Sequence, residues 1–246
     1  MNPVANRATY SVRLTDRREV AERTVAFQFE KPEGFMFEAG QFVELALVNP
    51  SETDREGSSR AFSIASAPEE DVLVVATRMR NTAFKRVLQT MPLGTGVTIE
   101  GPFGNLVLHA NATRPAVLLA GGIGITPFRS ILLHATKENL PHRIVLFYAN
   151  RRPEDAAFLS EIEALQLENP QFTFVGTMTR MEHSHLPWQG ERGEVNQAML
   201  AKFLKHAIDP MFYLAGPPGM VNGLRTVLQE MGIKNEDIRD EEFSGY

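Results

Sequence analysis

The residues with the clearest capacity for chemistry form a glycine-rich turn, GGIGITP, at residues 121–127. An apolar run at 116–120 precedes the turn and a helical pattern at 128–136 follows it, so the turn joins a buried strand to a helix. Glycines let the backbone approach a ligand closely, and the first turn of a helix offers free N–H groups to phosphate. Pro127 fits there because that position needs no N–H. The turn predicts a pyrophosphate site; a tight turn without a ligand is the alternative.

Arginines follow the next two apolar runs of the sequence. Arg151 comes after the run at 143–149, and Thr179 and Arg180 follow the run at 172–177. Many dinucleotide-binding turns are followed by an acidic residue that holds ribose hydroxyls. A guanidinium instead grips phosphate oxygens in a bidentate way, which favours a ligand with an additional 2′-phosphate. Ordinary solvated arginines at strand ends are the alternative.

A second candidate segment, Arg60-Ala61-Phe62-Ser63, lies in the first half of the chain. Side chains alternate between the two faces of a strand, so Arg60 and Phe62 should share one face and Ser63 should lie on the other. Taken alone, the segment is typical of a half-buried strand.

The first 110 residues predict short strands separated by turns. Strands are expected at 9–14, 24–29, 42–48, 61–65, 72–77 and 97–100, with one helix at 82–89. Several short strands without long helices indicate a closed or nearly closed antiparallel, Greek-key-like β-barrel.

The remaining residues alternate between strand and helix. Strands are expected at 116–120, 143–149, 172–177 and 211–215, and helices at 128–136, 155–165, 197–204 and 220–230. This alternation predicts a doubly wound α/β domain whose ligands bind beyond the carboxyl ends of the strands. We place the boundary near residues 109–114, which gives domains at 1–110 and 111–246.

Composition excludes several classes of function. The chain has 246 residues and a formal net charge of -5, without the clustered basic residues of a nucleic-acid surface. It has no cysteine, so it can form no disulfide, cysteine-ligated zinc site, nucleophilic thiol or iron–sulfur cluster. We expect no metal, since His183 and His185 lie in a polar loop. The first 14 residues lack a signal-peptide core and 116–128 is too short to cross a bilayer, so a cytoplasmic protein without membrane contact is expected.

Five motifs occur in a fixed order along nearly the whole chain. They are RAFS at 60–63, GPFG at 101–104, GGIGITP at 121–127, AGPPGM at 215–220 and EEF at 241–243. In this order, on a barrel followed by an α/β domain, they resemble the ferredoxin-NADP reductase superfamily. The resemblance implies an N-terminal FAD-binding barrel and a C-terminal NAD(P)H-binding domain, with the flavin between them.

The resemblance assigns roles in the barrel residue by residue. Arg60 would meet the flavin nucleotide's phosphate, Phe62 would pack on the isoalloxazine and Ser63 would bond near its N5, with Ala61 in the same segment. The other flavin-contacting positions it implies are Ala76, Thr77 and Arg78 on the strand beside the ring, and Ala83, Phe84 and Lys85 at the helix facing the pyrophosphate. Lys85 stands where the family commonly has serine.

The resemblance also assigns the nucleotide positions of the second domain. The turn residues are Gly121, Gly122, Gly124, Thr126 and Pro127. Arg151, Thr179 and Arg180 match positions that hold the 2′-phosphate in NADPH-using members. Gly216, Pro217 and Met220 match the motif bordering the nicotinamide, with Ala215 where many members have cysteine.

The chain end carries the last matching positions. Glu241 lies two residues before Phe243, which is the spacing of the family's carboxylate and of the aromatic residue covering the flavin; Tyr246 is a second aromatic candidate. The residues implied in catalysis are Ser63, Thr126, Glu241 and Phe243.

The resemblance implies transfer of a hydride from NADPH, or NADH, to FAD. Because this chain cannot ligate an iron–sulfur cluster, its electrons should pass to a separate carrier, with ferredoxin or flavodoxin as the leading partner. We expect a monomer. The alternatives are a reductase component of an oxygenase, a reductase of free flavin, quinone or ferric iron, and a non-catalytic flavin or nucleotide redox sensor.

Overall fold

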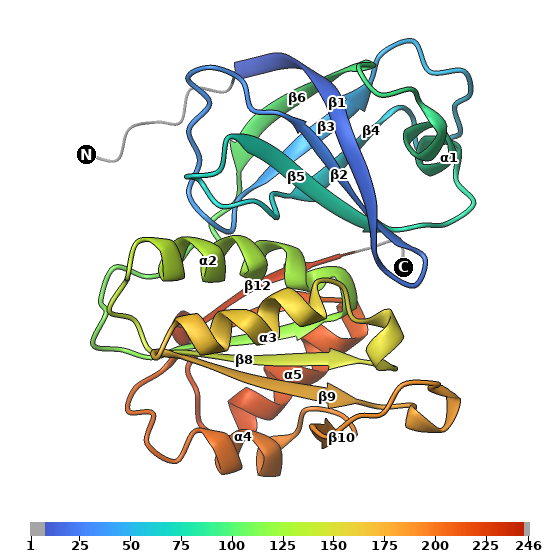
Figure 1. Ribbon diagram of the computed structural model, residues 1–246. Coiled ribbons are helices and arrows are strands. Elements are labelled where there is room, and N and C mark those ends of the chain that lie inside the picture. Colours follow the sequence, from blue (N-terminus) through green and yellow to red (C-terminus); the bar gives the residue numbers. More distant parts are fainter. Residues whose placement is uncertain (1–7, 244–246) are drawn as a thin grey trace.

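The computed structural model describes residues 8–243, which form two six-stranded sheets. The N-terminal sheet is antiparallel, with strand order β4-β3-β6-β1-β2-β5, and the C-terminal sheet is parallel, with order β10-β9-β8-β7-β11-β12. Figure 1 shows the first sheet curled above the second, with helix α2 between them. The predicted fold class, an antiparallel barrel followed by a doubly wound α/β domain, is confirmed.

The barrel closes where its two outer strands meet. The Ala65 N–H, just after β4, donates to the Val74 carbonyl of β5 over 2.7 Å. Phe27, Phe29 and Leu45 are among the side chains that fill the interior. The barrel elements are β1 (Ala8–Ala21), β2 (Thr24–Glu30), β3 (Phe42–Leu47), β4 (Ser59–Ser63), β5 (Val72–Arg78), α1 (Ala83–Thr90) and β6 (Gly96–Phe103).

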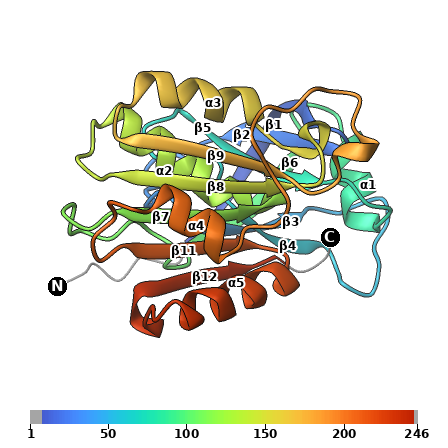
Figure 2. The ribbon, with the colours of Figure 1, turned by 90° about the horizontal axis from the view of Figure 1, so that it is seen from below.

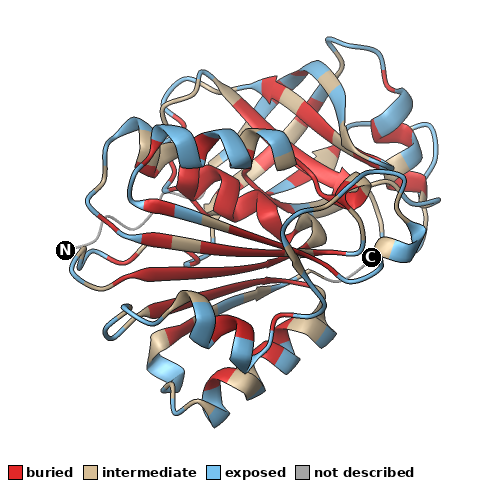
Figure 3. Cartoon of the chain, turned by 60° about the horizontal axis from the view of Figure 1, so that its bottom comes forward, coloured by how far each residue is buried: buried red, intermediate tan, exposed pale blue. Residues whose placement is uncertain are grey.

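The parallel sheet is apolar because it is covered on both faces. Every residue of β7 and β11 is buried, as Figure 3 shows for the centre of the sheet. Helices α2 and α3 cover the face toward the barrel, and α4 and α5 cover the other face (Figure 2). The elements are β7 (Ala116–Gly121), α2 (Ile125–Lys137), β8 (Ile144–Asn150), α3 (Leu159–Glu168), β9 (Phe172–Met178), β10 (Glu191–Arg192), α4 (Gln197–Phe203), β11 (Met211–Gly216), α5 (Pro218–Glu230) and β12 (Ile238–Glu242). Short 3₁₀ turns at 122–124, 153–155, 181–183 and 235–237 complete the chain.

The structure differs from the sequence prediction at several elements. Strand β10 was not predicted, and β1 runs on to Ala21, beyond the strand expected at 9–14. Strand β12 was missed because four of its five residues are charged, which is compatible with a sheet edge but hides the strand pattern. The helix expected at 155–165 begins only at Leu159, because Phe158 takes a left-handed conformation (φ 59°) and separates it from the preceding 3₁₀ turn. Helix α2 starts at Ile125, earlier than expected.

The connection between the two sheets runs from Phe103 to Ala116. A domain boundary near residue 110 lies within it and stays our proposal. Across residues 8–243, no helix combines the length and apolar character needed to cross a membrane.

Candidate functional site

The glycine turn lies where the strand order of the parallel sheet reverses, between β7 and β11. Gly122 has φ 54°, a conformation that side chains resist. A Cβ on Gly124 would lie 2.1 Å from the Ala215 carbonyl oxygen, so β11 leaves no room for one. The Thr126 hydroxyl donates to the Ile123 carbonyl over 3.0 Å and is buried, which braces the turn from within. Pro127 lies in the first turn of α2, as predicted.

The end of β11 packs against this turn. A Cβ on Gly121 would lie 2.2 Å from the Met220 sulfur, and one on Gly216 would lie 3.2 Å from the Gly121 backbone. Gly216, Pro217 and Met220 therefore meet the glycine turn directly.

A cavity of about 640 Å³, here called the sheet-edge cavity, opens beside the turn. It lies at the carboxyl ends of β7, β8, β9 and β11. Among the predicted nucleotide positions it is lined by Gly121, Gly122, Arg151, Thr179, Pro217 and Met220. Arg78 reaches it from the barrel, through an ion pair of 3.2 Å with Asp155.

Arg151, which lines this cavity, and the next residue, Arg152, have different surroundings. Arg152 pairs with Asp155 at 2.9 Å and with Glu22 of the barrel at 2.7 Å. Arg151 is exposed, and within residues 8–243 its guanidinium has no hydrogen-bonding or ion-pairing partner. Arg180 donates its backbone N–H to the Arg151 carbonyl, so it neighbours Arg151, although its side chain does not line the cavity. Arg151 and Thr179 are therefore brought together, with Arg180 beside them.

Sequence reasoning missed two polar residues of the cavity wall. Asn150 is 6% exposed, and its Nδ2 has no hydrogen-bond partner. A buried amide without a partner is costly, so this donor is suited to a ligand. Glu194 adds a carboxylate to the same wall. The signal for Asn150 was available, because a polar residue ends an otherwise apolar strand.

A second group of charges, here called the barrel cluster, surrounds Arg60. The Arg60 guanidinium pairs with Glu56 at 2.8 Å and with Asp54 at 3.4 Å. The other Asp54 oxygen accepts the N–H of Ala83 at the start of α1 over 3.0 Å. Lys85 lies beside them and donates to the Arg78 carbonyl over 2.7 Å. Burial and the nearby Arg80 and Arg60 lower the pKa of Lys85 to about 8.

The barrel cluster and the sheet-edge cavity both suit phosphate. In the barrel cluster a guanidinium and the N-terminus of α1 already converge on one anion, the Asp54 carboxylate. In the cavity an unpaired arginine and an orphaned amide stand beside a glycine turn. These donor sets fit a flavin nucleotide at the barrel and a dinucleotide at the sheet edge.

The two faces of β4 separate the predicted roles. Arg60 lies over the Phe84 ring at 5.1 Å, and Phe62 packs on the same ring at 5.9 Å. Arg60 and Phe62 thus share one face, as predicted, while Ala61 is exposed. On neighbouring β5, Ala76 and Thr77 are buried.

Ser63 on the other face of β4 meets the C-terminal strand. Its hydroxyl donates to the Glu241 carboxylate over 3.1 Å. Parallel pairing of β12 with β11 sets Glu241 opposite Ala215, and the Phe243 N–H donates to the Gly216 carbonyl over 2.9 Å. Burial raises the pKa of Glu241, and the Ser63 hydrogen bond opposes that rise. Tyr246 lies outside the described residues.

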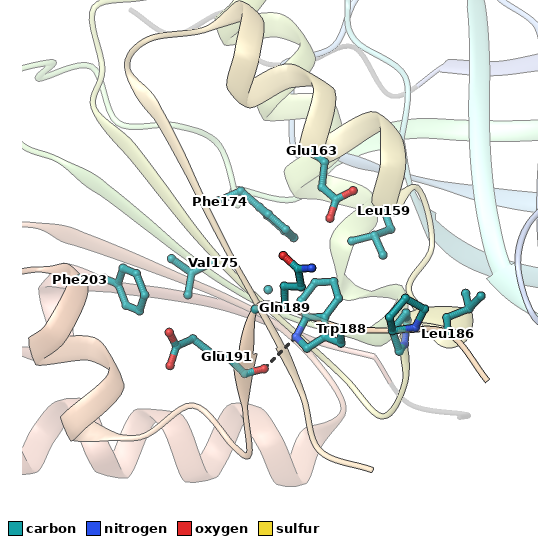
Figure 4. Close-up of a pocket in the computed structure, with 13 residues that line it drawn as sticks. Leu159, Glu163, Phe174, Val175, Leu186, Trp188, Gln189, Glu191 and Phe203 are labelled. Atoms are coloured by element: carbon teal, nitrogen blue, oxygen red, sulfur yellow. Dashed lines mark hydrogen bonds between the residues drawn. The ribbon is translucent and has the colours of Figure 1, made fainter. Parts of the chain in front are cut away.

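A further cavity, of about 540 Å³, lies away from these groups at the β9 edge (Figure 4). Trp188 dominates it and donates its ring N–H to the Glu191 carbonyl over 2.9 Å. A Cβ on Gly176 or Gly190 would lie 2.6 Å from the Trp188 ring. Trp188 therefore packs on two glycines.

Comparisons with known proteins agree with this geometry. Residues 118–226 match the oxidoreductase NAD-binding domain family. The chain is 27% identical over 245 residues to ferredoxin–NADP reductase B of Sorangium cellulosum, covering 95% of this chain and 97% of that protein. It is also 27% identical over 210 residues to a terephthalate 1,2-dioxygenase reductase component of Comamonas, covering 85% of this chain. The chain spans only 60% of the length of that relative.

A similar fold occurs in a ferredoxin NADP+ reductase from Neisseria gonorrhoeae whose crystal structure holds FAD and NADP. The TM-score is 0.76 at 24% identity, with 95% of this chain and 98% of that chain covered. At this identity the likeness establishes the shared fold.

Proposed function

We propose that the chain, which is similar to reductases of the ferredoxin–NADP reductase superfamily, is an FAD-dependent oxidoreductase that oxidises NADPH. The contact between Ser63 and Glu241 carries this proposal. It joins the strand of the barrel cluster to the end of the sheet that holds the glycine turn. Two cofactors bound at the two phosphate-binding groups would therefore meet at this junction.

Each group of residues has a separate task in the proposed enzyme. Arg60, Lys85 and the N-terminus of α1 bind the phosphates of FAD. The glycine turn binds the pyrophosphate of the nicotinamide nucleotide, and Arg151 with Thr179 and Arg180 holds its 2′-phosphate. When bound, FAD supplies the redox chemistry by accepting a hydride from the nicotinamide.

Ser63 and Glu241 can hold and transfer a proton where the barrel meets the C-terminal strand. Because burial raises the pKa of Glu241, its carboxyl keeps a proton to higher pH than an exposed glutamate does. The pair can then hold or pass a proton at the Ser63 Oγ, while Phe243, anchored through Gly216, covers the same region.

The electron acceptor we propose is a small redox protein, ferredoxin or flavodoxin. These 246 residues contain no cysteine, so an iron–sulfur cluster in the pathway would be held outside them. Similarity to the terephthalate dioxygenase reductase supports a second candidate, the reductase component of an oxygenase.

The test is the visible spectrum of the purified protein, followed by anaerobic addition of NADPH or NADH. We expect a yellow protein whose flavin absorbance NADPH bleaches rapidly. Arg180→Ala should raise the KM for NADPH far more than that for NADH. A colourless protein that cannot be reconstituted with FAD would contradict the flavin assignment. Faster bleaching by NADH would overturn the NADPH preference and favour the oxygenase-reductase candidate.

A further inference from the structure

A buried arginine joins the two halves of the proposed site. Arg129 lies one turn into α2, four residues after the start of the helix, and is 4% exposed. Guanidinium groups are rarely this buried unless their donors are paired. The burial of Arg129 therefore indicates that its donors are paired.

Those partners come from both domains. One terminal nitrogen of Arg129 donates to the Ala65 carbonyl in the barrel. Its Nε donates to Glu161 of α3 over 3.0 Å, and the other terminal nitrogen donates to the second oxygen of the same carboxylate. The guanidinium also lies 4.7 Å from the centre of the Phe158 ring. Glu161 of α3 thus fixes the orientation of the guanidinium, while its remaining terminal nitrogen bonds to the barrel at Ala65.

The next residue of α2 repeats the connection. The Ser130 hydroxyl donates to the Ser66 carbonyl over 2.7 Å, and the Ser66 hydroxyl accepts the Val74 N–H over 3.0 Å. Two consecutive carbonyls of the barrel are therefore held by two consecutive residues of α2. We call this set of contacts the α2 clamp.

The α2 clamp lies close to the residues that serve the two cofactors. Ala65 is two residues after Ser63, and Arg129 is three residues, about one helical turn, after Thr126. A displacement at the clamp would therefore move Ser63 relative to the glycine turn. Reacting groups must come within roughly 3–3.5 Å, and a misplacement of about 1 Å can slow a reaction about a hundredfold.

We propose that Arg129 is a positioning residue that sets the separation between the flavin strand β4 and the nucleotide turn. This inference rests on the proposed function. It predicts that Arg129 affects the rate of flavin reduction more than the affinity for either cofactor, because its side chain contacts neither binding group directly.

The same helix supplies a matched control. His134, about a turn and a half further along α2, bonds to Glu69 of the barrel over 2.6 Å. It is more exposed than Arg129 and lies farther from the glycine turn. His134→Gln alters a contact between α2 and the barrel without touching the clamp.

The experiment compares flavin-loaded wild type, Arg129→Lys, Glu161→Gln and His134→Gln. Anaerobic rapid mixing gives the limiting rate of flavin reduction and the apparent Kd of NADPH, and amide hydrogen exchange without nucleotide reports on residues 64–70 and 125–130. For Arg129→Lys we expect a limiting rate lowered about ten- to a hundredfold, a Kd within about threefold of wild type, and faster exchange in both segments. Glu161→Gln should give a smaller effect of the same kind, and His134→Gln should preserve the limiting rate.

Contradictory outcomes separate the two claims. If wild type is reduced and both Arg129→Lys and Glu161→Gln keep its limiting rate, positioning is wrong while the reductase function stands. If only the Kd changes, Arg129 is a binding residue and the proposal is also overturned. If Arg129→Lys does not fold, Glu161→Gln decides, because its carboxylate is partly exposed and its loss leaves the arginine and its Ala65 bond in place. If NADPH and NADH both fail to reduce wild type, the proposed function and the positioning role fall together.

Discussion

The barrel cluster and the sheet-edge cavity both offer positive groups to phosphate. In the barrel cluster these groups are paired with carboxylates, whereas at the cavity some of them have no partner. In the barrel cluster, Asp54 and Glu56 pair with Arg60, and Asp54 also takes the N–H of Ala83. At the cavity, Arg151 has no partner within residues 8–243, and the Asn150 amide is an unpaired donor. The neighbouring Arg152 is paired with Asp155 and Glu22, and Arg78 on the barrel side of the cavity is also paired with Asp155.

This difference has a physical consequence for binding. A phosphate entering the barrel cluster must compete with carboxylates for the same donors, so part of its binding free energy is spent on displacing them. A phosphate entering the cavity meets donors that are already available and oriented, which lowers the cost of binding. We therefore expect flavin binding to rearrange the loop at 51–57 and nucleotide binding to leave the cavity wall in place.

The largest effect should come from removing the central cation of the barrel cluster. Arg60→Ala is expected to weaken FAD retention about 10- to 150-fold, because a charged hydrogen bond contributes roughly 1.5–3 kcal/mol. Equilibrium titration of apoprotein with FAD measures this change. Arg86→Ala is the control, since Arg86 lies on α1 next to the barrel cluster and pairs with the exposed Glu52. A fully flavinated Arg60→Ala protein would remove Arg60 from the site.

The next effect should distinguish Arg151, which lines the cavity, from the adjacent Arg152. Arg151→Ala is expected to raise the Kd of NADP+ about tenfold, the loss of one charge-assisted contact, and to leave NAD+ within about twofold. Arg152→Ala should instead weaken both nucleotides equally or lower the melting temperature, because Arg152 pairs with Asp155 and Glu22. Calorimetric titration and thermal unfolding distinguish these outcomes. Equal losses for the two nucleotides in Arg151→Ala would refute the 2′-phosphate assignment.

Removing the carboxylate of Asp54, which competes with phosphate for Arg60, should strengthen FAD binding by a smaller factor. Asp54→Asn should tighten FAD binding about two- to fivefold, since exposed ion pairs contribute little but the competitor is removed. Glu52→Gln provides the control, because Glu52 pairs with Arg86 rather than Arg60. Weaker FAD binding by Asp54→Asn would mean that Asp54 organises the site and does not compete for it.

The smallest effect is a pH dependence of FAD affinity. It should occur only in the barrel cluster, which contains a titrating lysine, and not at the cavity, where the cation is arginine. The pKa of Lys85 is lowered to about 8, so its ammonium is charged below that pH and neutral above it. Phosphate favours the charged form, and FAD affinity should therefore fall about threefold between pH 7 and 9. Lys85→Met should abolish this dependence. NADP+ affinity should stay constant over the same range because arginine keeps its charge; an equal slope for NADP+ would show that Lys85 is not its source.

Prediction from sequence succeeded where a local pattern determines the structure. The glycine turn, the apolar strands and the alternating faces of β4 follow from periodicity and backbone sterics, which act within a few residues. Strand β12 was missed because its charged residues give no such pattern, and the Ser63–Glu241 contact spans 178 positions. The role of Asp54 was also hidden, since only folding brings it between Arg60 and the start of α1. Residue types could not reveal that Arg151 is unpaired while Arg152 is neutralised.

The contrast between the two regions can be measured directly by mapping amide chemical shifts in apoprotein titrated separately with FAD and with NADP+. We predict that FAD shifts the amides of 51–57 and 83–86, where carboxylates must release their partners. NADP+ should shift 121–126 and 150–151 and leave 51–57 unchanged. If FAD leaves both barrel segments unperturbed, or if NADP+ rearranges 51–57, the two regions do not divide the cofactors as proposed.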